Sequence, residues 1–388
     1  MKNRSLLMIP GPVEFEPAVL AEMGSPTTSH LAPGFIEAFG QALEGMRQVF
    51  LCPEGQPFVI AGTGTLAMDS AGANLVEPGD RALVVNTGYF GDRFGMILER
   101  YGAQVTHVRA AIGDCPALEE VEKALSQVEY KLVTVTQVDT STGVLVDIAA
   151  LGKLARMYGV LLVVDGVCSL AGEELKMSEW GVDLTLTASQ KAVGVPPGLA
   201  LLMVSQHALE SFKARRNPVL NYYADWNNWL PVMQAYEARK ASYFATPAVN
   251  LVYALNVSLG LILAEGMEAR IERHRKISRS CKAAIQALGL EQVPVRPEVA
   301  AHTMSAPRFP AGVNGPDFVT RVGRAGVTLA RGLHPAIRSE YFRIGHMGSV
   351  NLGDILATIG AIEIALKECG YQFTAGAGLA AAAAAINE

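Results

Sequence analysis

The sequence lacks several features that would mark particular classes of protein. Only 18% of its residues are charged, and the net charge of −5 is spread without runs of one sign, which gives no basis for binding nucleic acid or an anionic membrane. The five cysteines form no CxxC pair and no metal-like spacing with histidine, as expected for free thiols in a reducing cytosol. No apolar run has membrane-spanning length, and the run before Pro10 is too short for a signal peptide. We therefore expect a soluble cytoplasmic protein without a bound metal.

Apolar residues, in contrast, are abundant. They make up 50% of 388 residues, which predicts a compact protein with more than one domain. We expect an extended N-terminal segment over residues 1–16, a large domain over 17–265 and a smaller domain over 266–374. The alanine-rich residues 375–388 are expected to form a loosely held, low-complexity tail.

Predicted strands and helices alternate through the first half of the chain. The strands are expected at 57–61, 81–85, 105–108, 131–136, 161–164 and 183–187, and the helices between them at about 66–76, 117–127 and 148–158. This alternation is typical of an α/β fold with a largely parallel sheet covered on both faces. Further on, long helices at about 248–264 and 266–288 precede short strands near 301–308, 327–330 and 341–344.

A carboxylate and an amine each follow a predicted strand within residues 161–198. The apolar run at 161–164 ends at Asp165, and the strand at 183–187 leads to Lys191. Open α/β sheets bind ligands at the carboxyl ends of their strands. A lysine amine can form a Schiff base with an aldehyde, and a buried aspartate can keep a pyridine nitrogen protonated. The pair suits pyridoxal phosphate (PLP), although an ordinary strand-end aspartate and a surface lysine would give the same pattern.

The glycine-rich segment GTGT at 62–65 lies between a predicted strand and a predicted helix. Glycines let backbone N–H groups approach a phosphate, and a helix N-terminus favours negative charge. The longer string GTGTLA also fits a dinucleotide-binding fingerprint, with Asp80 placed for a ribose contact, and a simple tight turn is a third interpretation. Of these interpretations, Lys191 favours a GTGT segment that binds the phosphate of PLP, because a dinucleotide-binding fold has no use for that lysine.

Seven motifs, taken in order, resemble those of the class V aminotransferases of PLP fold type I. They are MIPGPV at 8–13, SH at 29–30, GTGT at 62–65, TSTGV at 140–144, VVDGVCSLAG at 163–172, SQKAVGVPPG at 189–198 and FRIGHMG at 342–348. In these motifs the sequence is most similar to the alanine–glyoxylate and serine–pyruvate aminotransferases. The resemblance covers nearly the whole chain. It implies a large domain with a mostly parallel, seven-stranded sheet and a smaller α+β C-terminal domain.

The resemblance also implies roles around the cofactor ring. Lys191 would form the Schiff base and then carry a proton between the substrate Cα and the cofactor C4′. Asp165 would pair with the pyridinium nitrogen. Val167 would pack on one ring face and Phe90 on the other, with Tyr89 as the neighbouring candidate.

The remaining cofactor contacts implied by the resemblance are polar. Ser141, or else Thr142, would hydrogen-bond near the ring hydroxyl. The phosphate would be held by Thr63, Gly64, Thr65 and Gln190. Tyr243 and Thr246 of a partner subunit would reach the same phosphate, which implies a homodimer with shared active sites.

Arg343, in the FRIGHMG motif, is implied to bind the substrate carboxylate. A planar guanidinium binds a carboxylate with two parallel hydrogen bonds, which fixes the orientation of an amino acid. The implied reaction moves an amino group from alanine or serine to glyoxylate or pyruvate with ping-pong kinetics.

Other functions are compatible with parts of the pattern. A 2-aminoethylphosphonate or aspartate aminotransferase would share the fold and much of the motif set. A desulfurase is disfavoured because residues 327–350 contain no cysteine. An NAD-dependent dehydrogenase, resting on GTGTLA alone, is the distant alternative. Nothing in the sequence decides the amino donor.

Overall fold

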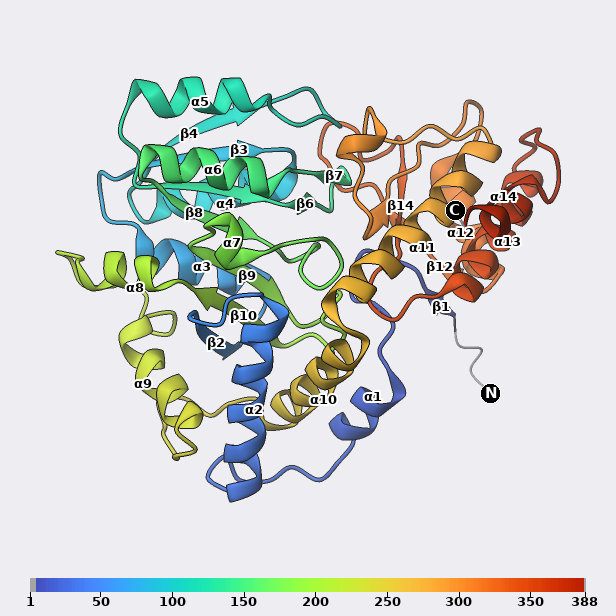
Figure 1. Cartoon of the computed structure of the whole chain (residues 1–388). Helices are drawn as coiled ribbons and strands as arrows, with labels where there is room; N and C mark the ends of the chain where they lie inside the picture. The colour runs from blue at the N-terminus through green and yellow to red at the C-terminus, as the bar shows by residue number, and fades with distance from the viewer. Residues whose placement is uncertain (1–4, 387–388) are drawn as a thin grey trace.

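The computed structural model describes residues 5–386, and its largest feature is a seven-stranded sheet (Figure 1). The strand order is β2 (Gln56–Ala61), β10 (Leu199–Val204), β9 (Leu184–Ala188), β8 (Leu161–Asp165), β5 (Leu132–Thr136), β3 (Arg81–Asn86) and β4 (Gln104–Arg109). β10 is antiparallel to both neighbours, and the other pairs are parallel. The prediction of a mostly parallel, seven-stranded sheet is confirmed.

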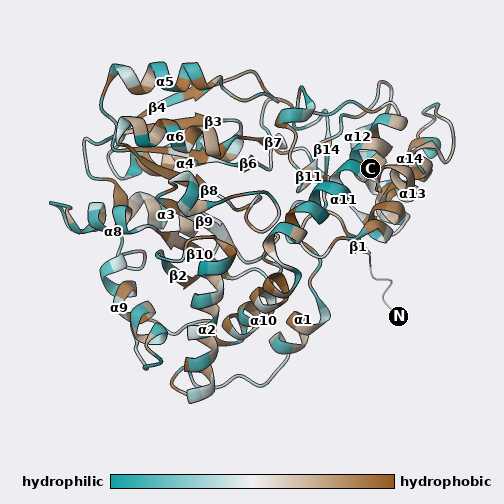
Figure 2. Cartoon of the chain, viewed as in Figure 1, coloured by the Kyte–Doolittle hydropathy of each residue, from teal (hydrophilic) through white to brown (hydrophobic). Residues whose placement is uncertain are grey.

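Helices cover this sheet, so its central strands are buried on both faces. They are α2 (Pro33–Val49), α3 (Gly64–Leu75), α4 (Tyr89–Arg100), α5 (Leu118–Gln127), α6 (Ile148–Tyr158), α7 (Met177–Trp180), α8 (Gln206–Lys213), α9 (Trp226–Glu237) and α10 (Val249–Glu265). Every residue of β5, β8, β9 and β10 is buried. The continuous apolar runs of these strands follow from that burial, and Figure 2 shows them as largely hydrophobic ribbons.

The C-terminal part packs four helices around a small sheet. The helices are α11 (Met267–Ala287), α12 (Gly315–Arg324), α13 (Leu352–Glu368) and α14 (Ala377–Ala385). The sheet joins β11 (Met304–Ser305), β14 (Phe342–Gly345) and β13 (Ala330–Arg331), all antiparallel, while β1 (Leu6–Leu7) pairs in parallel with β12 (Val327–Thr328). The strand expected over 301–308 is therefore much shorter than predicted.

The expectation of a loosely held C-terminal tail is wrong for most of its length. Residues 377–385 form α14, and Ala382 is fully buried. The carboxylate of Glu363 accepts hydrogen bonds from the backbone N–H groups of Gly376, Gly378 and Leu379 at 2.7–3.2 Å. Alanine is the best helix former, and a carboxylate at a helix N-terminus is stabilising. The ends of the predicted tail and N-terminal segment, residues 387–388 and 1–4, lie outside the described residues.

The buried apolar side chains form two clusters, one around the large sheet and one among α11–α14. Between them, α10 and α11 meet at Gly266 with a bend of 84°. We therefore propose that the boundary between the two domains lies near residue 265. Within residues 5–386 no single helix is long and apolar enough to cross a membrane, and only this bent pair meets the requirement by length and composition.

Candidate active site

A cavity of about 220 Å³ opens where β8 ends at Asp165 and where the loop after β9 carries Lys191. It lies at the carboxyl ends of parallel strands, where open α/β sheets bind ligands. Most of the predicted site residues lie together on its wall: Thr63, Gly64, Thr65, Phe90, Asp165, Val167, Gln190 and Lys191. The wall also includes Met68, Arg93, Thr136, Val138, Thr140 and Cys168, which the sequence analysis did not single out.

Asp165 is the last residue of β8 and is buried. One carboxylate oxygen accepts the backbone N–H of Val167 at 2.9 Å, and the other accepts the hydroxyl of Thr136, its neighbour in register on β5, at 3.3 Å. Burial, together with the nearby charge of Asp139, raises the pKa of Asp165 to about 6. A cation bound against this carboxylate would keep it ionised.

Lys191 is held under the N-terminal segment of the chain. Its Nζ donates a hydrogen bond to the carbonyl oxygen of Pro10. Gly11 has φ +120°, and a Cβ on it would lie 2.5 Å from Nζ of Lys191, so any other residue there would be strained and would displace the lysine side chain. Burial lowers the pKa of Lys191, and the charge of Arg343 lowers it further. A lowered pKa favours the neutral amine, which is the nucleophilic and basic form.

The expected phosphate cradle is the start of α3. Thr63 is the N-cap residue, and its side chain makes no capping hydrogen bond. The first N–H groups of a helix have no partner within the helix, so they are free to bind an anion. A Cβ on Gly64 would lie 2.9 Å from Val167, so the glycine allows close packing. Gln190 lines the cavity, and its buried Oε1 has no hydrogen-bond partner among the described residues.

The structure does not bring Ser141 or Thr142 to the cavity wall. Ser141 Oγ donates to Asp139 at 2.6 Å and accepts the N–H of Tyr89 at 3.0 Å. Thr142 is fully buried, and its hydroxyl donates to a backbone carbonyl of the loop before α4 at 3.0 Å. Both hydroxyls are thus engaged in holding the start of α4, and Thr140 faces the cavity in their place.

Asp139 fixes the expected ring-stacking side chain. Its Oδ2 accepts the backbone N–H of Phe90 at 2.9 Å, and its Oδ1 accepts the N–H of Ser141 at 2.8 Å. Burial raises the pKa of this carboxyl group. A residue adjacent to the TSTGV motif was therefore missed, because its role depends on a contact with the start of α4, about fifty residues earlier.

Arg93 is the second residue that sequence reasoning missed. It donates to the hydroxyls of Thr65 at 3.0 Å and Tyr89 at 3.2 Å, and its guanidinium lies 4.9 Å from the ring centroid of Phe90. It forms no ion pair with a carboxylate of the described chain, so its positive charge faces the cavity beside the start of α3. Its position near Phe90 was visible in the sequence, but nothing separated it from a surface arginine.

Arg343 lies on β14, close to the cavity but not on its wall. Its Nε donates to the carbonyl of Arg331 at 2.8 Å and its Nη1 to the carbonyl of Thr140 at 2.9 Å. Burial lowers its pKa. The guanidinium is therefore anchored next to the cavity-lining Thr140.

Tyr243 and Thr246 lie away from the cavity, in the exposed segment between α9 and α10. The side chain of Tyr243 is 61% exposed, and its ring lies 5.3 Å from that of His30. Large apolar side chains are also exposed in these parts of the chain, among them Leu31, next to His30, and Tyr222, just before α9. The single chain thus leaves both predicted phosphate ligands on its surface.

Comparison with known proteins defines the class. The family model for class-V aminotransferases matches residues 19–352, and the chain belongs to that family. It is 39% identical to alanine–glyoxylate aminotransferase 1 of Saccharomyces cerevisiae, covering 89% of this chain and 93% of the relative. It is 33% identical to serine–glyoxylate aminotransferase of Arabidopsis thaliana, covering 98% and 94%. The crystal structure of ureidoglycine–glyoxylate aminotransferase from Bacillus subtilis superposes with a TM-score of 0.93 at 27% identity, covering 100% and 99%.

The cavity fits the cofactor of this family. It combines the first N–H groups of α3, which have no partner within the helix, with the hydroxyl of the N-cap residue Thr63, which makes no capping hydrogen bond. These features suit a phosphate, while Asp165 and Lys191 suit a pyridine nitrogen and an aldehyde. The protein is therefore a PLP-dependent aminotransferase, and the predictions of fold, enzyme class and cofactor are confirmed. The roles of individual site residues remain proposals.

Proposed function

We propose that the enzyme moves an amino group from a small L-amino acid, alanine or serine, to glyoxylate. The observation that carries this proposal is the single cavity that joins Asp165, Lys191 and the start of α3. Three similar proteins are named for glyoxylate with three different amino donors, which supports the acceptor more strongly than the donor. Aspartate and 2-aminoethylphosphonate are the alternative donors.

The chain's own residues hold the cofactor at both ends. Thr63, Gly64 and Thr65 at the start of α3, with Gln190, would hold the phosphate, and Arg93 adds a positive charge on that side. Asp165 would hold the ring nitrogen, while Phe90 and Val167 enclose the ring. When bound, PLP supplies an electron sink that stabilises negative charge at the substrate Cα.

Lys191 and Arg343 act on the substrate. Nζ of Lys191 would remove the proton from the substrate Cα and carry it to the cofactor C4′, and its lowered pKa favours the neutral amine that this role needs. Arg343 binds the substrate carboxylate with the part of its guanidinium that does not bond to Thr140 and Arg331. The first product leaves before the oxo acid enters, so the kinetics are ping-pong.

The active enzyme in this proposal is a cytoplasmic homodimer. Tyr243 and Thr246 are exposed, and Leu31, Leu220 and Tyr222 expose apolar side chains at 52%, 84% and 76%. In this proposal a second subunit would cover these exposed apolar side chains. The partner's Tyr243 and Thr246 would complete the phosphate site. The five cysteines are all free, which is compatible with a reducing compartment.

Half-reactions test the proposed donor and acceptor directly. The absorption spectrum of purified enzyme would be followed after adding alanine, serine, aspartate or 2-aminoethylphosphonate separately. We expect alanine or serine to bleach the yellow band and glyoxylate to restore it. Bleaching only by aspartate or 2-aminoethylphosphonate would replace the donor assignment, and restoration by pyruvate but not glyoxylate would overturn the acceptor.

A further inference from the structure

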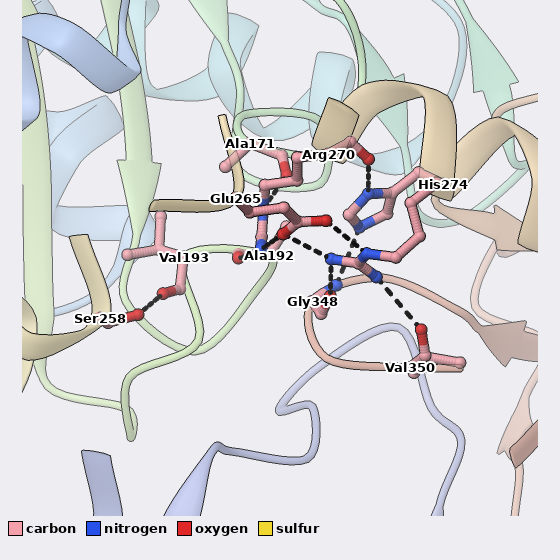
Figure 3. A network of polar contacts seen from close by, with 10 residues as sticks. Ala171, Ala192, Val193, Ser258, Glu265, Arg270, His274, Gly348 and Val350 are labelled. Carbon is pink, nitrogen blue, oxygen red and sulfur yellow. Dashed lines mark hydrogen bonds and ion pairs between the residues drawn. The ribbon is translucent and has the colours of Figure 1, made fainter. Parts of the chain in front are cut away.

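Arg270 joins the two segments that carry Asp165 and Lys191. It lies in the first turn of α11, and its side chain is buried. Its Nε donates to the carbonyl of Ala171 at 2.9 Å, and its Nη2 donates to the carbonyl of Ala192 at 2.7 Å. Its Nη1 pairs with Glu265, the last residue of α10, at 2.8 Å. Figure 3 shows the guanidinium at the centre of these partners.

The two carbonyls place Arg270 next to the chemistry. Ala192 directly follows Lys191, and Ala171 lies in the turn over residues 167–172, which follows Asp165. Ala171 has φ +63°, a left-handed conformation that is unusual for a non-glycine residue, so its carbonyl is aimed by an uncommon backbone conformation. A planar guanidinium holds two acceptors at a fixed separation. Arg270 therefore sets the distance between the two segments.

The same cluster also binds the loop that follows β14, the strand of Arg343. Glu265 accepts from Arg273 Nε at 2.6 Å, and Arg273 donates to the carbonyls of Gly348 at 3.0 Å and Val350 at 3.2 Å. His274 contacts the carbonyl of Arg270 through Nδ1 at 2.7 Å and accepts the N–H of Gly348 at its Nε2, at 3.0 Å (Figure 3).

Arg270 makes more hydrogen bonds than a buried ion pair requires. An ion pair alone would be satisfied by Glu265, whereas the remaining guanidinium nitrogens reach one carbonyl beside each predicted catalytic segment. We propose that Arg270, oriented by Glu265, is a positioning residue that fixes Nζ of Lys191 relative to Asp165 and to the strand of Arg343. The inference rests on the roles proposed for those three residues.

Arg270→Lys and Arg270→Gln test the inference in the PLP-loaded enzyme. Lysine keeps the charge but cannot span both carbonyls, so it should behave more like glutamine than like arginine. We expect both variants to lower kcat on the order of 10- to 100-fold, as a displaced catalytic group does, with KM changed less than about threefold. The isotope effect from deuterium at the substrate Cα should rise, and the pH midpoint of the lysine-bound cofactor's absorption should shift.

Arg275→Gln is the matched control, because Arg275 lies on the same helix and pairs with the half-buried Glu174 and Glu272. It should match wild type in all readouts. The inference is overturned if the Arg270 variants lose thermal stability but keep the wild-type kcat, isotope effect and absorption midpoint. If Arg270→Gln does not fold, Arg270→Lys and Glu265→Gln are judged by the same criteria. A wild-type enzyme that binds PLP without transaminating would refute the proposed function, while the absorption midpoint would still test the role of Arg270.

Discussion

The carbonyl of Pro10 accepts a hydrogen bond from Nζ of Lys191, although the two residues lie 181 positions apart. The contact is supported on both sides, because Met8 is buried in the cluster among α11–α14 and Val13 in the cluster around the large sheet. The N–H of Val13 also donates to the carbonyl of Gln190 at 3.2 Å. The N-terminal segment therefore contacts the side chain of Lys191 directly and links the two clusters.

Gly11→Ala adds a single methyl group, yet it should lower both the stability of the protein and its affinity for PLP. The added Cβ would overlap the Lys191 side chain, and φ +120° is strained for alanine, so we expect a stability loss of about 1–3 kcal/mol together with weaker PLP binding. Thermal unfolding and PLP titration measure the two effects. Gly312→Ala is the control, because Gly312 has φ +83° with nothing within 4 Å. Equal PLP affinity in the two variants would contradict the prediction.

Lys191→Ala should abolish turnover while the protein still folds. Loss of both the nucleophile and the proton carrier should reduce kcat on the order of 10⁴-fold or more. Borohydride reduction followed by mass spectrometry should attach the cofactor to the wild type but not to the variant. Lys153→Ala, at an exposed position of α6, serves as the control. Covalent attachment of the cofactor to the Lys191 variant would show that another lysine is used.

Asp165→Asn should raise the stability of the cofactor-free protein and lower the activity of the loaded enzyme. The folded-state pKa of Asp165 is raised to about 6 from 3.8, so its favourable contribution is present below pH 3.8 and is lost as pH rises to 6. At neutral pH the cofactor-free variant should therefore be more stable than wild type by up to about 3 kcal/mol. Its loaded form should lose on the order of 10²-fold or more in kcat. Urea unfolding with and without PLP checks this, and lower stability of the cofactor-free variant at pH 7 would contradict it.

Acid should destabilise the protein through two buried histidines. Burial lowers the pKa values of His274 and His346 to about 3 from 6.5, so between those values the unfolded state binds more protons. Stability should fall as pH drops below 6.5, by up to about 1.4 kcal/mol per pH unit for each histidine. His346→Gln should flatten the curve measured by urea unfolding, because the variant has no buried imidazole at this position. A slope equal to that of the wild type would argue against a neutral, buried His346.

Mixing two inactive variants should restore activity if the active sites are shared. In a hybrid of Lys191→Ala with a chain carrying Tyr243→Ala and Thr246→Ala, one site receives both lesions and the other receives none. We expect mixed, refolded chains to regain up to about a quarter of wild-type activity, because half of random dimers are hybrids with one intact site. Light scattering should show dimers. No recovery in confirmed hybrid dimers would place these residues in their own subunit's site or outside it.

Much of the site could be predicted because its residues lie at strand ends and helix starts. Asp165 and Lys191 follow apolar runs, and Gly64 begins a helix, so local patterns revealed them. Asp139 and Arg270 could not be found this way, since each acts through a backbone group far away in the sequence.

The errors in the fold have similar causes. β10 was not predicted as a strand, because the bend at residues 194–198 obscured the apolar run that follows it. The tail was misjudged because its composition resembles low complexity, whereas the carboxylate that caps α14 is supplied by α13. Both errors concern partners brought in by tertiary structure rather than by local sequence.

The pairing of β2 with β10, which comes much later in the chain, has a consequence for the order of folding during synthesis. β2 is at one edge of the large sheet and pairs only with β10. Synthesis proceeds from the N-terminus, so β2 leaves the ribosome long before its only neighbour and remains an unpaired apolar segment until residue 204 has emerged. During this interval the nascent chain is exposed to chaperones and to aggregation. The large sheet is complete only after β9, the strand that leads to Lys191, has been synthesised.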